Sequence, residues 1–176
     1  MGRRIYENGN FVWKYTFGRQ DSEMIRLAEE FEVGNYSTDI SNDEDGQMTC
    51  RTWSVNKETD LPKLKKVLEE LLQGKTIEEL QSIGIKALKD FVKKQSPEWK
   101  KNFEDDLEWV NKAKSDDDFQ YHDSFSNNME FKTYDIYANA IEEKTTESWD
   151  FIKMVKTFIE YIEKEDRKEF AFDDEY

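Results

Sequence analysis

The segment that most resembles a metal-binding loop runs from Ser41 to Thr52. When it is aligned with an EF-hand calcium loop, Asp43, Asp45 and Gly46 occupy the third, fifth and sixth positions. Such a loop needs a bidentate Glu at its twelfth position, and Thr52 stands there instead. We therefore interpret the segment as an acidic turn before a strand and predict no metal site.

His122 is the only histidine, and Asp123 and Ser124 follow it directly. A catalytic triad takes its members from separate segments, because adjacent side chains of an extended segment point apart. The sequence also lacks a Gly-x-Ser-x-Gly nucleophile motif. Cys50, the only cysteine, is interpreted as a small buried residue of a strand. We predict no catalytic residue and no cofactor, and the sequence leans against an enzyme.

The C-terminal third is rich in carboxylates. The chain has 26 basic and 40 acidic side chains, a net charge of −14, and residues 115–176 hold 18 of the acids but only 7 of the bases. Carboxylates spaced along a helix imitate the phosphates of a nucleic acid and suit a basic groove. The predicted partner-binding residues are Asp150, Glu160, Glu163, Asp166, Glu169, Asp173, Asp174 and Glu175.

The middle of the chain is basic, with 10 basic and 6 acidic side chains in residues 61–101. Six lysines there could form a patch: Lys86, Lys89, Lys93, Lys94, Lys100 and Lys101. Arginine, which forms bidentate forks with phosphate, is scarce, at 6 residues against 20 lysines. We interpret these lysines as helix surface that faces the acidic C-terminal third.

A β-hairpin is predicted at the N-terminus. Arg3–Glu7 and Asn10–Phe17 flank Asn8-Gly9, the pair preferred in a type I′ turn, where both central residues have positive φ. One face of the second strand would carry four aromatic residues, namely Phe11, Trp13, Tyr15 and Phe17. We expect this face to be buried against helices.

The rest of the first third alternates between structured and polar segments. Residues 21–32 have the apolar pattern of a short helix, residues 34–46 are polar and predict a loop, and residues 47–55 are rich in the residues that favour a strand. The hairpin and this strand would form a small antiparallel sheet.

Helices are predicted for most of the remaining chain. Residues 61–114 are helical throughout, with a capping box from Thr76 to Glu79 and a break near Gly84. Residues 119–140 fit a strand or a helix equally well, and residues 148–166 form an amphipathic helix followed by an acidic tail at 167–176.

Together these segments predict an α+β fold in one domain, residues 1–176. It would consist of an N-terminal β-hairpin and at least one further antiparallel strand, in a β-rich part at 1–55, packed against a predominantly helical remainder. No internal disulfide is possible, and neither a signal peptide nor a bilayer-spanning run is found, so the expected location is the cytoplasm. The excess of lysine over arginine and the scarcity of alanine hint at a bacterial or phage source.

The leading functional hypothesis is a non-enzymatic acidic inhibitor or adaptor of the toxin-immunity or phage anti-defence type. It would bind a basic protein surface, for example that of a nuclease or another nucleic-acid-binding protein, and occlude a nucleic-acid or substrate groove. Direct binding to nucleic acid or to an anionic membrane is disfavoured by the net charge. Two alternatives stay open, an enzyme with a dispersed carboxylate site and a structural or assembly subunit. The sequence leaves the oligomeric state open.

Overall fold

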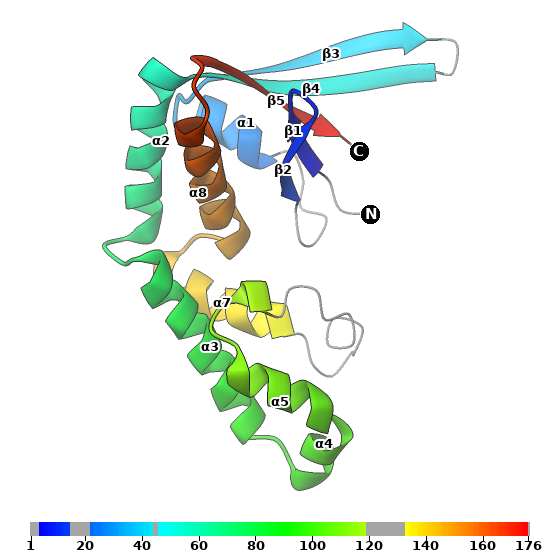
Figure 1. The fold of residues 1–176 in the computed structure, drawn as a ribbon, viewed down its shortest axis with the longest axis vertical. Helices are drawn as coiled ribbons and strands as arrows, with labels where there is room; N and C mark the ends of the chain where they lie inside the picture. Colours follow the sequence, from blue (N-terminus) through cyan, green and yellow to red (C-terminus); the bar gives the residue numbers. More distant parts are fainter. Residues whose placement is uncertain (1–3, 15–21, 44–45, 119–132, 176) are drawn as a thin grey trace. The chain divides into compact units, whose positions relative to one another are not determined.

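The computed structural model describes residues 4–14, 22–43, 46–118 and 133–175 (Figure 1). It confirms the α+β fold, with an N-terminal hairpin in an antiparallel sheet and a mainly helical remainder. The chain separates into two compact units, residues 1–71 with 150–176 and residues 72–149, and each is described by itself. The assignment of the whole chain to one domain stays a prediction.

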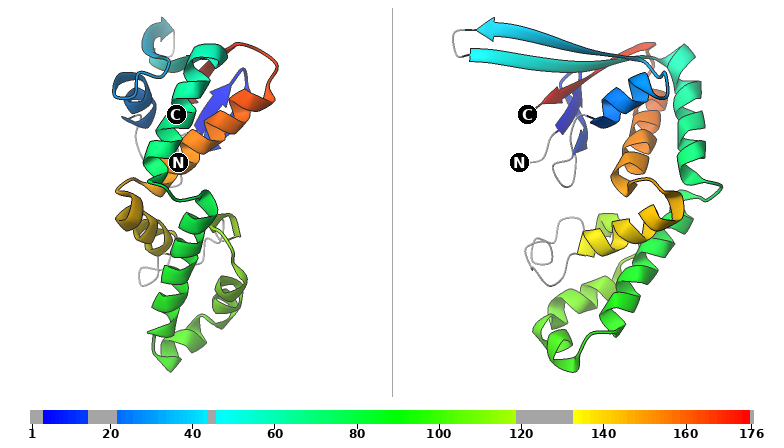
Figure 2. Two further views of the ribbon diagram at one scale, coloured as in Figure 1. Left: turned by 90° about the vertical axis from the view of Figure 1, so that its left-hand side faces the viewer. Right: turned by 180° about the vertical axis from the view of Figure 1, so that it is seen from behind.

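The first unit contains a sheet of five antiparallel strands in the order β2-β1-β5-β4-β3 (Figure 1). The strands are β1 (Arg4–Glu7), β2 (Asn10–Lys14), β3 (Asn35–Asp43), β4 (Gly46–Asn56) and β5 (Glu169–Glu175). The strand from the C-terminus therefore lies in the centre and joins the N-terminal hairpin to the β3–β4 hairpin. The helices of this unit lie on one side of the sheet (Figure 2).

The turn of the first hairpin forms as predicted, with φ of 49° at Asn8 and 76° at Gly9. The predicted aromatic face is wrong at Phe11, because the register shifts by one residue within the hairpin. Tyr6 pairs with Phe11 and Ile5 with Trp13, so Val12 is the extra residue of a β-bulge. Trp13 is buried as expected, whereas Phe11 is 57% exposed. Tyr15 and Phe17 lie outside the described residues.

Two segments differ from their predicted structure. The predicted loop at 34–46 contains β3, which pairs with β4 over nine residue pairs despite its polar composition. The predicted acidic tail contains β5, in which Phe170 and Phe172 are buried while Ala171 between them is exposed. In both cases pairing with a neighbouring strand outweighs the weak strand propensity of Asn, Asp, Ser and Glu.

The core of this unit lies between the sheet and its helices, α1 (Ser22–Glu29), α2 (Lys57–Leu72) and most of α8 (Trp149–Lys164). The ring of Phe158 on α8 lies 5.0 Å from that of Trp53 and 4.8 Å from that of Phe172. The indole N–H of Trp53 donates to the carbonyl of Val33 at 2.9 Å. The predicted helices at 21–32 and 148–166 are confirmed as α1 and α8.

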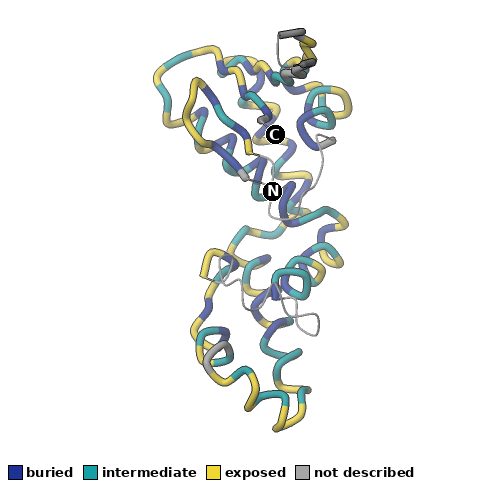
Figure 3. The backbone as a smooth tube through the Cα atoms, turned by 90° about the vertical axis from the view of Figure 1, so that its right-hand side faces the viewer, coloured by how far each residue is buried: buried dark blue, intermediate teal, exposed yellow. Residues whose placement is uncertain are grey.

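The second unit is helical in its described part: α3 (Ile77–Lys93), α4 (Pro97–Asn102), α5 (Glu104–Lys112), the short 3-10 turn η1 (Asp116–Asp118) and α7 (Thr133–Thr145). The capping box of Thr76 and Glu79 is present at the start of α3. Of the ambiguous segment, residues 133–140 belong to α7 and residues 119–132 lie outside the described part. Buried positions recur along α3 and α7 (Figure 3).

The predicted break near Gly84 is wrong, because α3 continues through this residue. A Cβ atom at position 84 would lie 2.5 Å from the ring of Tyr137 on α7. The glycine therefore marks a close contact between two helices and no helix end.

Candidate functional site

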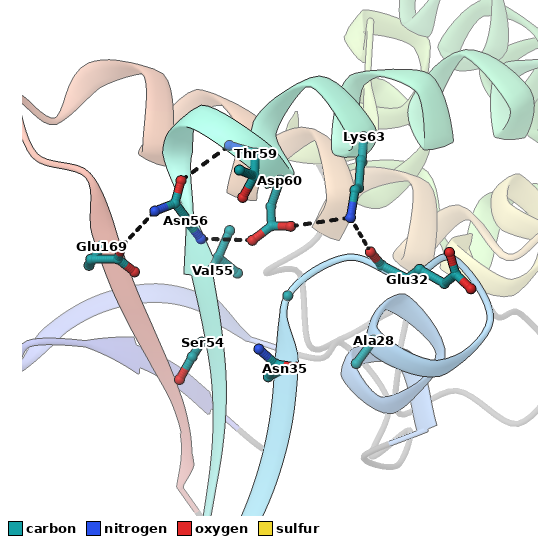
Figure 4. A pocket seen from close by; sticks show the side chains of 11 residues that line it. Ala28, Glu32, Asn35, Ser54, Val55, Asn56, Thr59, Asp60, Lys63 and Glu169 are labelled. Atoms are coloured by element: carbon teal, nitrogen blue, oxygen red, sulfur yellow. Dashed lines mark hydrogen bonds and ion pairs between the residues drawn. The ribbon is translucent and has the colours of Figure 1, made fainter.

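A hollow of about 460 Å³ lies at the start of α2 (Figure 4). Asn56, the last residue of β4, caps this helix: its side-chain oxygen accepts hydrogen bonds from the backbone N–H groups of Glu58 at 2.9 Å and Thr59 at 3.1 Å. The helical segment predicted from residue 61 therefore begins four residues earlier, at Lys57. The hollow is thus built around a strand that turns directly into a helix.

Several polar groups of this hollow bind one another (Figure 4). The buried carboxylate of Asp60 accepts the backbone N–H of Asn56 at 2.8 Å and lies 3.7 Å from the ammonium of Lys63. Lys63 also donates to the carbonyl of Glu32 at 2.8 Å, and the amide of Asn56 donates to Glu169 at 2.5 Å. These bonds brace β5, β4, α2 and the segment after α1, which is a structural use of the carboxylates.

A second carboxylate of the first unit, Glu7, is only 2% exposed. It accepts hydrogen bonds from both terminal nitrogens of Arg167 and, at 2.9 Å, from the hydroxyl of Tyr161. Burial acts to raise the pKa of Glu7, but these bonds and one from the N–H of Ala171 outweigh it and hold the pKa below its usual value. The ion pair ties β1 to the turn between α8 and β5.

The second unit contains a buried carboxylate of its own, Asp116. It accepts the indole N–H of Trp149 at 3.0 Å and the hydroxyl of Tyr137 at 3.3 Å. Burial, followed by the neighbouring charge of Asp116, raises the pKa of Tyr137 far above its usual value, so the phenol stays protonated. The three side chains hold η1, α7 and the first residue of α8 together.

The structure separates the eight predicted partner-binding residues by exposure. Asp150 and Asp174 are buried, and the half-buried Asp173 accepts the hydroxyl of Thr52 at 2.7 Å. The side chain of Glu175 lies outside the described part of the chain. Four carboxylates of the predicted set are exposed, namely Glu160, Glu163, Asp166 and Glu169. Their role in partner binding stays a prediction.

Lysines accompany the exposed acids of α8. Lys156 lies 2.5 Å from Glu160 on the same helix, and Lys65 of α2 lies 2.5 Å from Glu163. Lys57 donates to the main-chain carbonyl of Glu165 at 2.7 Å. The charge of this helix face is therefore partly balanced within the molecule.

The β3–β4 hairpin extends beyond the rest of the sheet (Figure 1). Among the described residues, the pairing of β4 with β5 begins at Arg51, whereas β4 residues 46–50 pair with β3. At ~3.4 Å per residue, this two-stranded extension is roughly 17 Å long. All four residues from Ser37 to Ile40 are exposed, so neither face of the strand is covered there. We call the two-stranded part, residues 39–43 and 46–50, the free ribbon.

Sequence reasoning missed the free ribbon, although a signal was available. Asp45-Gly46 is a dipeptide typical of hairpin turns, and it directly precedes the predicted strand. Ile40 within the ribbon is 61% exposed, and with Phe11 it is one of two strongly exposed large apolar residues in the described part of the chain. Both stand on edge strands of the sheet.

Part of the predicted lysine patch lines a shallow hollow of about 470 Å³ in the second unit. Lys86, Lys89 and Lys93 of α3 meet Lys114, which follows α5, around Asp90. Asp90 lies 2.7 Å from Lys86 and 3.8 Å from Lys93. The hydrogen bond from Lys86 is the main cause that lowers the pKa of Asp90. Whether the lysines face the acidic C-terminal third stays a prediction.

The remaining candidates for catalysis or metal binding lie wholly or partly in the parts of the chain that the structure does not describe. His122, Asp123 and Ser124 lie outside the described residues, as does the side chain of Cys50. Within the described part of the chain, no group of three or more His, Cys, Asp or Glu residues is arranged to hold a metal ion. None of its helices combines the length and apolar character that crossing a bilayer requires.

Comparisons with protein-family models, with curated proteins and with solved structures found no match to this chain.

Proposed function

We propose that this chain is a non-enzymatic adaptor or inhibitor that binds a basic protein surface. The proposal rests on the free ribbon, a two-stranded extension in which neither face is covered at Asp39 and Ile40. An isolated pair of strands is marginally stable in water, so an uncovered ribbon favours a role in which another surface covers it. A narrow ribbon is also a shape that can enter a groove and occlude it.

The charge of the ribbon favours a basic partner. Residues 35–56 contain four acidic side chains and one basic side chain, and Asp39 stands exposed in β3 beside Ile40. The first unit as a whole has 23 acidic and 15 basic side chains. Such a field accelerates association with a positively charged surface and makes binding sensitive to salt. The exposed carboxylates of α8 would add to this field.

The proposal is tested by capture followed by direct binding. The immobilised chain is exposed to a lysate of its source organism, captured proteins are identified by mass spectrometry, and each is purified and tested for binding by biolayer interferometry. We expect a partner with a basic surface whose association rate falls as salt rises from 50 to 500 mM. A partner with an acidic surface, or binding that is unaffected by salt, would overturn the proposal.

A further inference from the structure

β3 is a long edge strand with few of the features that protect such strands from pairing. Among the described strands only β4 pairs with it. In an antiparallel ladder, alternate residues of an edge strand direct their N–H and C=O groups away from the neighbour. Its nine residues include neither Pro nor Lys, which commonly block the edges of natural sheets. Its outer edge is therefore able to pair with a further strand.

The opposite edge of the same sheet is protected. In the described residues β2 runs from Asn10 to Lys14 and contains the bulge at Val12. A bulge twists an edge strand and is one of the usual means by which an edge is kept from pairing. The contrast between the two edges singles out β3.

The charged and apolar side chains of β3 indicate which kind of strand would pair with it. Its charged residues are Asp39 and Asp43, both acidic, so an approaching strand with basic residues is attracted and an acidic strand is repelled. A second copy of this chain carries the same net charge of −14 and the same acidic edge, which opposes pairing of β3 with itself. Ile40, 61% exposed, offers an apolar contact to one side chain of the incoming strand.

We infer that the outer edge of β3 binds an extended basic segment of a partner protein, which adds to the sheet as a further strand. Main-chain hydrogen bonds along β3 supply the affinity, and alternating basic and apolar side chains of the segment meet Asp39 and Ile40. This inference rests on the proposed function and specifies its partner as a protein with an exposed, extended basic segment.

The test uses a fluorescent nine-residue peptide of alternating Lys and Val, matched to the nine residues of β3, and measures its binding to the full chain by anisotropy. Ile40→Lys should weaken binding by about tenfold or more, because it removes the apolar contact and adds a like charge. Phe11→Lys is the matched control, since it makes the same change at an exposed position of the other edge strand, and it should leave binding within about twofold. Circular dichroism checks that both variants keep the fold.

A second peptide, with every backbone nitrogen methylated, has the same charge but cannot pair as a strand, and it should not bind. Equal binding of the two peptides would overturn strand addition while leaving attraction to a basic surface, and thus the proposed function, intact. A larger loss with Phe11→Lys than with Ile40→Lys would overturn the choice of β3. Dimers of the free chain that Ile40→Lys converts to monomers, seen by light scattering, would assign the edge to a second copy and also overturn the inference.

Discussion

At the scale of single residues, Gly84 and Glu7 show how one side chain, or its absence, determines local packing. Gly84 lies in the middle of α3, where its missing Cβ admits the ring of Tyr137. Glu7 is a buried carboxylate that is kept charged by Arg167 and Tyr161. Neither contact is visible in a local sequence pattern, because each joins segments far apart in the chain.

Gly84→Ala should destabilise the second unit by about 1–3 kcal/mol, because the new methyl group overlaps a ring that is fully buried. Helix propensity alone predicts that the same change stabilises the unit, by about 1 kcal/mol. Measuring the free energy of unfolding in urea distinguishes these two predictions. Ser82→Ala, an exposed change in the same helix, is the control and should have a small effect. A stabilised Gly84→Ala variant would show that Tyr137 can move aside.

Glu7→Gln should destabilise the first unit by about 1.5–3 kcal/mol at neutral pH, since it weakens charged hydrogen bonds to Arg167. Because the folded pKa of Glu7 lies below 4.5, the unfolded state binds its proton first as pH falls. The stability contributed by this charge is therefore present above pH 4.5 and is lost as pH falls through the folded pKa.

The measurement for Glu7 is the free energy of unfolding of both proteins between pH 3 and 7. The difference between them should shrink below about pH 4.5. Glu160→Gln, at an exposed ion pair with Lys156, serves as the control and should cost less than about 0.5 kcal/mol. A Glu7→Gln difference that stays constant over this pH range would contradict a charged Glu7.

At the scale of elements, the strand-to-helix junction at Asn56 connects the sheet to α2. The side chain of Asn56 does two things: its oxygen caps the helix, and its amide donates to Glu169 of β5. Asp60 then accepts the N–H of Asn56, so the junction is held from both sides.

Asn56→Asp separates these two roles. An Asp caps a helix about as well as an Asn, so a residue that only capped would tolerate the change. Here the new carboxylate would stand where the amide meets Glu169 and beside Asp60, and we expect a loss of about 1 kcal/mol at neutral pH. Thr76→Asp at the cap of α3, where the Thr hydroxyl is the capping group, is the comparison and should cost less. An equal loss of stability in the two variants would show that the hydrogen bond from Asn56 to Glu169 contributes little.

The elements that the sequence predicts well are those with a strong local pattern. A few neighbouring residues are enough to predict three of them: the Asn8-Gly9 turn, the capping box at Thr76 and the apolar stripe of α8. β3 and β5 were missed because their strand character depends on pairing with distant partners, which overrides the weak propensity of their polar residues. The bulge at Val12 is not predicted for the same reason, because the register depends on how two strands pair.

The candidate site was predicted less well than the fold. Charge counting along the C-terminal third identified exposed acids such as Glu160 and Glu163, but it also selected Asp150 and Asp174, which are buried. Local charge does not report burial, because a carboxylate on the inward side of a helix or strand has the same sequence signature as one facing solvent. The free ribbon was absent from the prediction because its first strand resembled a loop.

At the scale of the whole molecule, the net charge of −14 and the free ribbon combine into one account. Long-range attraction would bring a basic partner to the chain, and the uncovered ribbon would supply the contact. In the proposed complex, charge would govern the rate of association and its salt dependence, and main-chain pairing along β3 would govern the lifetime.

Charge reversal at Asp39, by Asp39→Lys, should therefore slow association with the captured partner and weaken its salt dependence. Glu98→Lys, an equal change in charge at an exposed position of α4 in the other unit, is the matched control. Association rates are measured by stopped flow at several salt concentrations. The same slowing in both variants would mean that only the total charge matters and that the ribbon has no particular role.

Mapping the contact of the partner on the isotope-labelled chain would show whether β3 binds it. Amide NMR spectra of the chain are recorded with and without the captured basic partner. We expect the largest changes at residues 37–40 of β3, with small changes along β2 and in α3 to α5. Changes centred on α8 or on the lysine-lined hollow of the second unit, with β3 unaffected, would show that the partner does not bind at β3.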